Sequence, residues 1–106
     1  MMRGDIYWVR LDPTQGSEIN KRRPCVILSA NPINQARKTV VIIPLSSSTR
    51  AIPPITVGIH CIGQKGIAAI DQIRTVDQSR LESFIEPMKS VDLQRIEQAL
   101  RQVLVL

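Results

Sequence analysis

Short runs of β-branched residues, each bounded by a polar loop or a proline, restrict the fold of this chain more than any other feature. Valine and isoleucine make up 24 of its 106 residues, against one Phe, one Tyr and one Trp. Residues 24–29 and 39–44 are continuous apolar runs with the length of a buried strand, and residues 5–11 alternate between two faces. Because β-branched side chains are stiff and pack well on a pleated surface, the sequence predicts a mainly β fold with an aliphatic core.

The rest of the chain continues this pattern and ends in a helix. Long polar loops are predicted at residues 14–23 and 45–54, a turn at 63–66 containing two turn glycines, and further strands at 55–57, 59–62, 67–76 (broken near 71–72) and 84–87. Ser90 is expected to cap the helix and Asp92 to lie in its positive first turn. Apolar residues then recur at three- and four-residue spacing, at Leu93, Ile96, Leu100 and Val103 or Leu104. The pattern predicts a mainly β (α+β) fold: a small, strongly bent sheet or partly closed barrel with a C-terminal amphipathic helix.

Length and apolar patterning favour one domain that is not in a membrane. A chain of this size fits a single core, so residues 1–106 are expected to form one domain. The first residues lack the apolar segment of a secretory signal, and no apolar run approaches the roughly 20 residues that span a bilayer. Cys25 and Cys61 lie in apolar stretches without a C-x-x-C pair, so no disulfide is predicted. We expect a cytoplasmic protein with no membrane partner.

The net charge of +5 is concentrated in the first half of the chain. Residues 1–50 contain eight Lys or Arg and three Asp or Glu, whereas residues 51–106 contain six of each. Ten of the fourteen cations are arginine, whose planar guanidinium grips phosphate with two hydrogen bonds. The charge favours a polyanionic partner, although a basic surface kept for solubility is the alternative.

Metal and cofactor chemistry has little support in the sequence. His60 is the only histidine and is most simply a packed strand residue, and the cysteines and carboxylates form no recognisable ligand spacing. No phosphate-binding glycine loop or nucleophile motif is present. We expect no metal and no cofactor.

Two polar loops carry the residues suited to a phosphate. Lys21, Arg22 and Arg23 precede the rigid Pro24, and a hydroxyl-rich run from Ser46 to Thr49 follows an apolar strand. If the two strands are neighbours, a guanidinium and a hydroxyl come together, which supplies the directed charge and hydrogen bonds that a reacting phosphate needs. The alternative is a pair of solvated loops.

Several segments carry a resemblance that runs through nearly the whole chain. They match in order and spacing, and they are specific only in combination: residues 3–9, 11–13, 16–18, 23–27, 71–77 and 80–81. On these segments the chain resembles the MazF/PemK family of toxin endoribonucleases. The resemblance implies an SH3-like, strongly bent β-barrel with short helices and a homodimer. It also implies a cognate antitoxin and metal-independent cleavage of single-stranded mRNA, leaving 2′,3′-cyclic phosphate and 5′-hydroxyl ends.

The resemblance also assigns candidate site residues. It implies that Arg23 and Ser46 form the catalytic pair, with Ser46 standing where many members have threonine. Glu18 is a candidate general base, since a guanidinium does not accept a proton near neutrality; otherwise it is a loop carboxylate that pairs with Lys21 or Arg22, or meets the antitoxin. The resemblance implies that Gly16, Ser17, Gln72 and Arg74 lie near the RNA. The cationic and hydroxyl-rich loops add Lys21, Arg22, Ser47, Ser48 and Arg50 as candidate RNA-binding residues.

Two other functions stay open at this level. CcdB-like toxins, which poison DNA gyrase, share the implied fold but rely on a Trp near the C-terminus, whereas the only Trp here is Trp8. A nucleic-acid-binding module without catalysis would also need only the basic first half.

Overall fold

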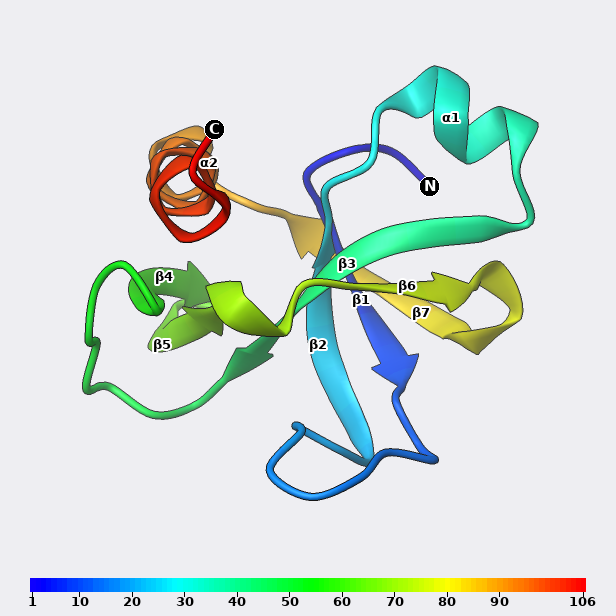
Figure 1. The fold of residues 1–106 in the computed structure, drawn as a ribbon. Coiled ribbons are helices and arrows are strands. Elements are labelled where there is room, and N and C mark those ends of the chain that lie inside the picture. Colours follow the sequence, from blue (N-terminus) through cyan, green and yellow to red (C-terminus); the bar gives the residue numbers. More distant parts are fainter.

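The computed structural model describes all 106 residues and consists of one curled antiparallel sheet with a C-terminal helix (Figure 1). The sheet has seven strands in the order β4-β5-β3-β2-β1-β7, and β6 pairs with β3 outside this path. The strands are β1 (Asp5–Arg10), β2 (Arg22–Ile27), β3 (Thr39–Ser46), β4 (Thr56–Cys61), β5 (Gln64–Ala69), β6 (Arg74–Asp77) and β7 (Leu81–Pro87). The predicted fold class is confirmed. β7 begins earlier than expected, at Leu81.

The central strand β3 passes from one half of the sheet to the other. Its first residues pair with β6, residues 42–44 pair with β2, and Leu45 and Ser46 pair with β5. Pro44 lies at the change of partner, where its missing N–H leaves no ladder donor to satisfy. The end of β3 therefore lies at the corner where the two halves meet.

Each face of the sheet has its own core, which explains why several strands read as continuous apolar runs. One core of twelve buried residues lies under the C-terminal helix and includes Ile6, Val26 and Ile43. The other has seven buried residues and includes Val9 and Ile27. Neighbouring residues on the same strand thus point into different cores, as the period of a strand requires.

The C-terminal helix α2 (Ser90–Leu104) crosses the β4–β5 side of the sheet (Figure 1). The predicted stripe is confirmed, because Leu93, Ile96, Leu100 and Val103 all pack on the larger core. The predicted cap is wrong: the residue before the helix is Lys89, no side chain caps the first turn, and Ser90 is already helical.

Three short helices connect the strands: α1 (Asn31–Ala36) and the 3₁₀ turns η1 (Ile70–Gln72) and η2 (Gln78–Arg80). The sequence does not predict α1, because six residues contain too little apolar periodicity to indicate a helix. Buried contacts stabilise it instead. The buried Asn34 side chain donates to the Ser29 carbonyl at 2.9 Å. No helix in the structure is both long enough and apolar enough to cross a membrane.

The hairpin between β4 and β5 corrects the predicted turn. The turn consists of Ile62 and Gly63 alone, and Gln64 to Gly66 already belong to β5. Gly63 has a φ of +69° and is a turn glycine as expected. Gly66 is not, because it pairs with Ile59 within the ladder.

A fully buried carboxylate joins α2 to the sheet. Asp92 accepts hydrogen bonds from the His60 amide at 2.8 Å and from Arg95 Nη1 at 3.3 Å, and His60 Nδ1 lies 3.2 Å from it. This contact accounts for both His60 and Asp92, which lies in the first helical turn as predicted.

We expect Asp92→Ala to lower the free energy of unfolding by about 2–4 kcal/mol, because the His60 amide, the His60 ring and the Arg95 guanidinium lose their common partner. Urea denaturation followed by circular dichroism measures this. The exposed Asp71 is the matched control, and Asp71→Ala should change the midpoint little. Equal losses in the two variants would show that the buried carboxylate does not join the helix to the sheet.

Candidate active site

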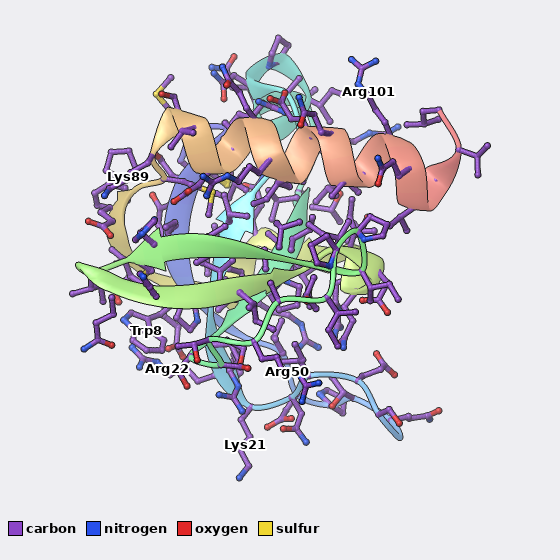
Figure 2. All side chains as sticks on the ribbon, turned by 90° about the vertical axis from the view of Figure 1, so that its left-hand side faces the viewer. Trp8, Lys21, Arg22, Arg50, Lys89 and Arg101 are labelled. Atoms are coloured by element: carbon purple, nitrogen blue, oxygen red, sulfur yellow. The ribbon has the colours of Figure 1, made fainter.

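A pocket of about 300 Å³ lies at the corner of the sheet, on the side of the β4–β5 hairpin away from α2 (Figure 2). Its walls come from β1, the start of β2, the end of β3 and the hairpin. The lining residues are Trp8, Arg22, Arg23, Pro24, Leu45, Ser46, Ser47, Ile59, Cys61, Ile62, Gln64, Lys65 and Gly66. The two loops expected to approach each other therefore do so.

Arg23 and Ser46 line this pocket from neighbouring strands. In the β2–β3 ladder Cys25 pairs with Pro44, and the same register continued by two residues brings Arg23 opposite Ser46. The β2–β3 ladder ends at Pro44. Arg23 and Ser46 are therefore not joined by backbone hydrogen bonds, and the space between their strands opens to the pocket. The strand geometry explains why these two side chains share one cavity.

The Arg23 guanidinium has unused hydrogen-bonding capacity. The residue is half-buried, and its Nε is buried without any hydrogen-bond partner. Buried polar atoms in folded proteins are nearly always partnered, and a charged donor is the costliest exception. Pro24 follows directly and fixes the backbone φ beside it. The pocket thus holds a preorganised cation that an anionic oxygen would satisfy.

Ser46 is held by its backbone and by the next loop. Its Oγ accepts a long hydrogen bond of 3.4 Å from the Ser48 amide, which leaves the Ser46 hydroxyl proton free for another partner. Its carbonyl lies so close to β5 that a Cβ at Gly66 would come within 2.5 Å of the Ser46 oxygen. Gly66 is therefore required by close backbone approach, not by a turn.

The Arg22 side chain is held by two contacts. Its guanidinium stacks 4.2 Å from the centre of the Trp8 ring, and its Nε lies 2.5 Å from Glu82 Oε1. Figure 2 shows Trp8 and Arg22 beneath the hairpin, with Arg50 and Lys21 on the same side of the molecule, away from α2. These basic groups thus lie on one side of the molecule, and Arg22 belongs to the pocket wall.

Several predicted site residues do not line the pocket. Gly16, Ser17, Glu18 and Lys21 lie in the β1–β2 loop, Ser48 and Arg50 in the β3–β4 loop, and Gln72 and Arg74 in or beside η1. Of the predicted RNA-binding residues, only Arg22 and Ser47 are among its lining residues.

The expectation that Glu18 meets the catalytic pair is not met in this structure. Its Oε2 lies 3.9 Å from Arg74 Nη1, and its Oε1 accepts from the Gln15 amide at 3.1 Å. The attraction of Arg74 directs the carboxylate toward β6, so Glu18 is a pairing carboxylate here, with Arg74 rather than with Lys21 or Arg22. Gln72 acts on the same loop, since its Oε1 accepts from the Ile19 amide at 2.7 Å. Gln72 and Arg74 thus fasten the β1–β2 loop to the body of the sheet.

The sequence did not indicate that the β4–β5 hairpin lines the pocket. Ile62, Gln64 and Lys65 line the pocket, although Ile62 was predicted as the end of a strand and residues 63–66 as an ordinary turn, and Trp8 lines it from β1. The only available signal was the alternation of β1, which separates Trp8 from the buried Val9 and Leu11. Nothing in the sequence pairs the hairpin with the cationic loop, because that contact depends on how the sheet curls.

The two thiols carry their protons at neutral pH. Burial raises the pKa of Cys25 to about 12, against the opposing effect of Arg74. Burial, and then the nearby Glu86 carboxylate, raise the pKa of Cys61, which lines the pocket. A protonated thiol is a poor nucleophile. No group of three or more His, Cys, Asp or Glu side chains is arranged to hold a metal ion.

Gly66→Ala should displace the end of β3, because the added methyl group meets the Ser46 carbonyl at 2.5 Å. We expect a loss of about 1–3 kcal/mol in the free energy of unfolding, as for other overpacked sites, and a crystal structure with Ser46 moved. Gly58→Ala on β4 is the control, since a Cβ there meets nothing within 4 Å. If Gly66→Ala proves as stable as Gly58→Ala and leaves Ser46 in place, this role for Gly66 is contradicted.

Comparisons with known proteins agree with this architecture. The chain aligns at 30% identity over 111 residues with the endoribonuclease MazF9 of Mycobacterium tuberculosis, covering 95% of this chain and 93% of that protein. It aligns at 29% identity over 105 residues with the endoribonuclease MazF of Staphylococcus saprophyticus, covering 94% and 88%.

Solved structures share the fold over the full chain. MazF from Deinococcus radiodurans superposes with a TM-score of 0.88 at 23% identity, covering 100% of this chain and 97% of that one. A mycobacterial endoribonuclease, solved in complex with its cognate antitoxin, superposes with a TM-score of 0.83 at 24% identity, covering 100% and 96%. The family model for the PemK-like, MazF-like toxin of type II toxin–antitoxin systems matches residues 2–104. The sheet, the terminal helix and this match together establish that the chain belongs to the PemK-like, MazF-like toxin family.

Proposed function

We propose that this chain is an endoribonuclease toxin that cleaves single-stranded RNA in the pocket of Arg23 and Ser46. One observation carries the assignment of the site: Arg23, whose buried Nε has no hydrogen-bond partner, lines the same cavity as Ser46. The named relatives are endoribonucleases, so neither gyrase poisoning nor nucleic-acid binding without cleavage is favoured.

The nucleophile of the reaction comes from the RNA itself. The ribose 2′ oxygen attacks the adjacent phosphorus, the bond to the 5′ oxygen breaks, and the products carry a 2′,3′-cyclic phosphate and a 5′-hydroxyl. One proton leaves the 2′ oxygen and one is gained by the departing 5′ oxygen. Because RNA supplies its own nucleophile, the protein has to orient the nucleotide and stabilise the charge that develops on phosphorus. We propose a metal-independent reaction on this ground.

Arg23 and Ser46 are suited to that stabilisation. A guanidinium keeps its charge at every physiological pH and offers directed N–H groups to the non-bridging oxygens. The Ser46 hydroxyl adds one donor, and its oxygen is already oriented by the Ser48 amide. Both groups are fixed by strands before any substrate binds, which favours the transition state over the flexible ground state.

Proton transfer is not assigned to a side chain of the pocket. Its lining residues include no carboxylate and no imidazole, and the Cys61 thiol, with its raised pKa, is a weak acid. Glu18 contacts Arg74 instead. We therefore infer that water accepts the 2′ proton and returns one to the departing 5′ oxygen, and that charge stabilisation contributes most of the rate.

The surroundings of the pocket suit a single strand. Lys65 and Arg22 line it, and Arg50 and Lys21 lie on the same side of the molecule (Figure 2), so a phosphate backbone would meet cations along its path. Bases of a single strand are free to leave their stack and contact Trp8 or an arginine plane. The RNA sequence preference would follow from the loops that border this path.

Partners are proposed from the relatives. The solved mycobacterial endoribonuclease is in complex with its cognate antitoxin. We propose that a cognate antitoxin binds this chain too, and that it covers the basic pocket and neutralises it. We also propose that the chain forms a homodimer and acts in the cytoplasm, where its RNA substrate is found.

Purified protein with a long single-stranded RNA in EDTA tests the function, with the ends of the fragments mapped. Discrete cuts with 5′-hydroxyl ends are expected. Arg23→Ala should reduce the cleavage rate by about a hundredfold or more without unfolding the protein, the size typical of losing one preorganised donor. Arg37→Ala, at an exposed position after α1, is the charge-matched control and should cleave normally.

Serine variants test, in the same assay, which hydroxyl of the run from Ser46 to Thr49 takes part in cleavage. Ser46→Ala should lose less activity than Arg23→Ala but more than Ser48→Ala, because Ser48 contributes its backbone amide rather than its hydroxyl to Ser46. Full activity of the Arg23 variant, or equal losses in the two serine variants, would refute the assignment.

Glu18→Gln distinguishes a general base from a pairing carboxylate. Since Glu18 contacts Arg74 and not the pocket, we expect its replacement to change the maximal rate by no more than about threefold and to leave the pH–rate profile in place. A loss comparable to that of Arg23→Ala, with the acidic limb of the profile removed, would show that the loop moves and delivers the base.

A further inference from the structure

Ile62, at the tip of the β4–β5 hairpin, has a backbone conformation that its residue type disfavours. Its φ is +53°, in the left-handed region, and Gly63 follows with a φ of +69°. Two-residue turns with both φ values positive favour Asn-Gly or Gly-Gly. A β-branched residue with positive φ is a genuine outlier, because its Cβ crowds the backbone. The turn would form more easily with asparagine or glycine at this position.

The Ile62 side chain contributes little to the stability of the fold. The Ile62 side chain is 60% exposed and belongs to neither hydrophobic core. Its amide is held by Glu86, whose Oε2 accepts from it at 2.5 Å, and any residue other than proline would supply that donor. The isoleucine side chain is therefore not explained by folding, and strained residues of this kind cluster at functional sites.

The exposed side chain lines the pocket that contains Arg23 and Ser46. It shares this rim with Lys65 of β5, and the pocket wall includes the Trp8 ring with Arg22 stacked on it. The lining residues thus combine apolar surfaces with Arg22, Arg23 and Lys65 and include no carboxylate, while Glu82 and Glu86 border the pocket through Arg22 and the Ile62 amide. A nucleotide has the complementary composition: an apolar base face and an anionic phosphate.

We propose that Ile62 is a substrate-binding residue whose side chain contacts the nucleobase beside the scissile phosphate. The apolar side chain at the rim covers one face of the unstacked base, while Arg23 and Lys65 attract the phosphates on either side. This inference rests on the proposed ribonuclease function and adds a specificity-determining contact to it. The charge of the lining favours RNA over an apolar segment of another protein, because an apolar peptide would leave these cations without partners.

The decisive variant is Ile62→Asn, which suits the turn and removes the apolar contact. We expect its melting temperature to be equal to or above that of the wild type, since asparagine tolerates the left-handed conformation. On single-stranded RNA its KM should rise by about tenfold or more, with kcat changed much less, because the catalytic pair is intact. The base preference next to the cut should also relax.

Two further variants complete the test. Ile62→Val keeps an apolar β-branched side chain and should restore most of the wild-type KM. Ile33→Ala removes an equally exposed isoleucine, 54% accessible on α1, and should leave KM unchanged. Wild-type KM together with wild-type base preference in the Ile62→Asn variant would overturn the proposal.

Other occupants of the rim give distinct results. If Ile62→Asn changes only the oligomeric state in gel filtration, or only neutralisation by an antitoxin, and KM stays the same, the side chain serves a protein interface and the proposal is wrong. Failure of the ribonuclease function itself is separate, because the wild-type protein would then cut no RNA.

Discussion

The close contact between β5 and the end of β3 is the constraint on which the site depends. The Ser46 carbonyl approaches β5 at Gly66, where no side chain fits. This contact joins the hairpin to the rest of the sheet just after β3 leaves β2. Because β2 and β3 part at that point, Arg23 and Ser46 face a cavity instead of each other's backbone. A sheet that continued to pair evenly would close the pocket.

Stability and function are assigned to different parts of the molecule. The helix α2 and the two hydrophobic cores hold the sheet in its curl, and Asp92 fixes the helix to β4 through buried hydrogen bonds. The pocket lies on the other side of the hairpin and contains the groups that folding alone would avoid. These are the unpartnered Arg23 Nε and the strained, exposed Ile62. The stable half of the structure supplies the rigidity that keeps these costly groups in place.

The loop between β1 and β2 forms an adjustable border to this rigid site. It is long and polar, and it is fastened by two side chains from the η1–β6 segment. Gln72 accepts from its backbone, and Arg74 attracts Glu18. Arg74 Nη1 is buried with no hydrogen bond, so this second fastening is an ion pair without full hydrogen bonding. Such a contact opens at modest cost, so the loop is held less firmly than the strands that it joins.

Periodicity alone determined much of the fold. The alternation of β1, the apolar runs of β2 and β3 and the stripe on α2 depend only on which residues are apolar and how they are spaced. The family resemblance, carried by short segments in a constant order, implied Arg23 and Ser46 as a pair. Short segments of this kind can be recognised in the sequence before the fold is known, because they consist of neighbouring residues.

Only the tertiary structure decided which groups meet across the corner of the sheet. Gly66 reads as a turn glycine until its approach to Ser46 is known, and Glu18 reads as a candidate base until Arg74 is found beside it. The hairpin residues Ile62 and Lys65 carry no sequence pattern that links them to β2. These contacts depend on the curl of the sheet. The curl results from the packing of many residues in two cores, which come from the whole chain, so no short segment of the sequence can indicate it.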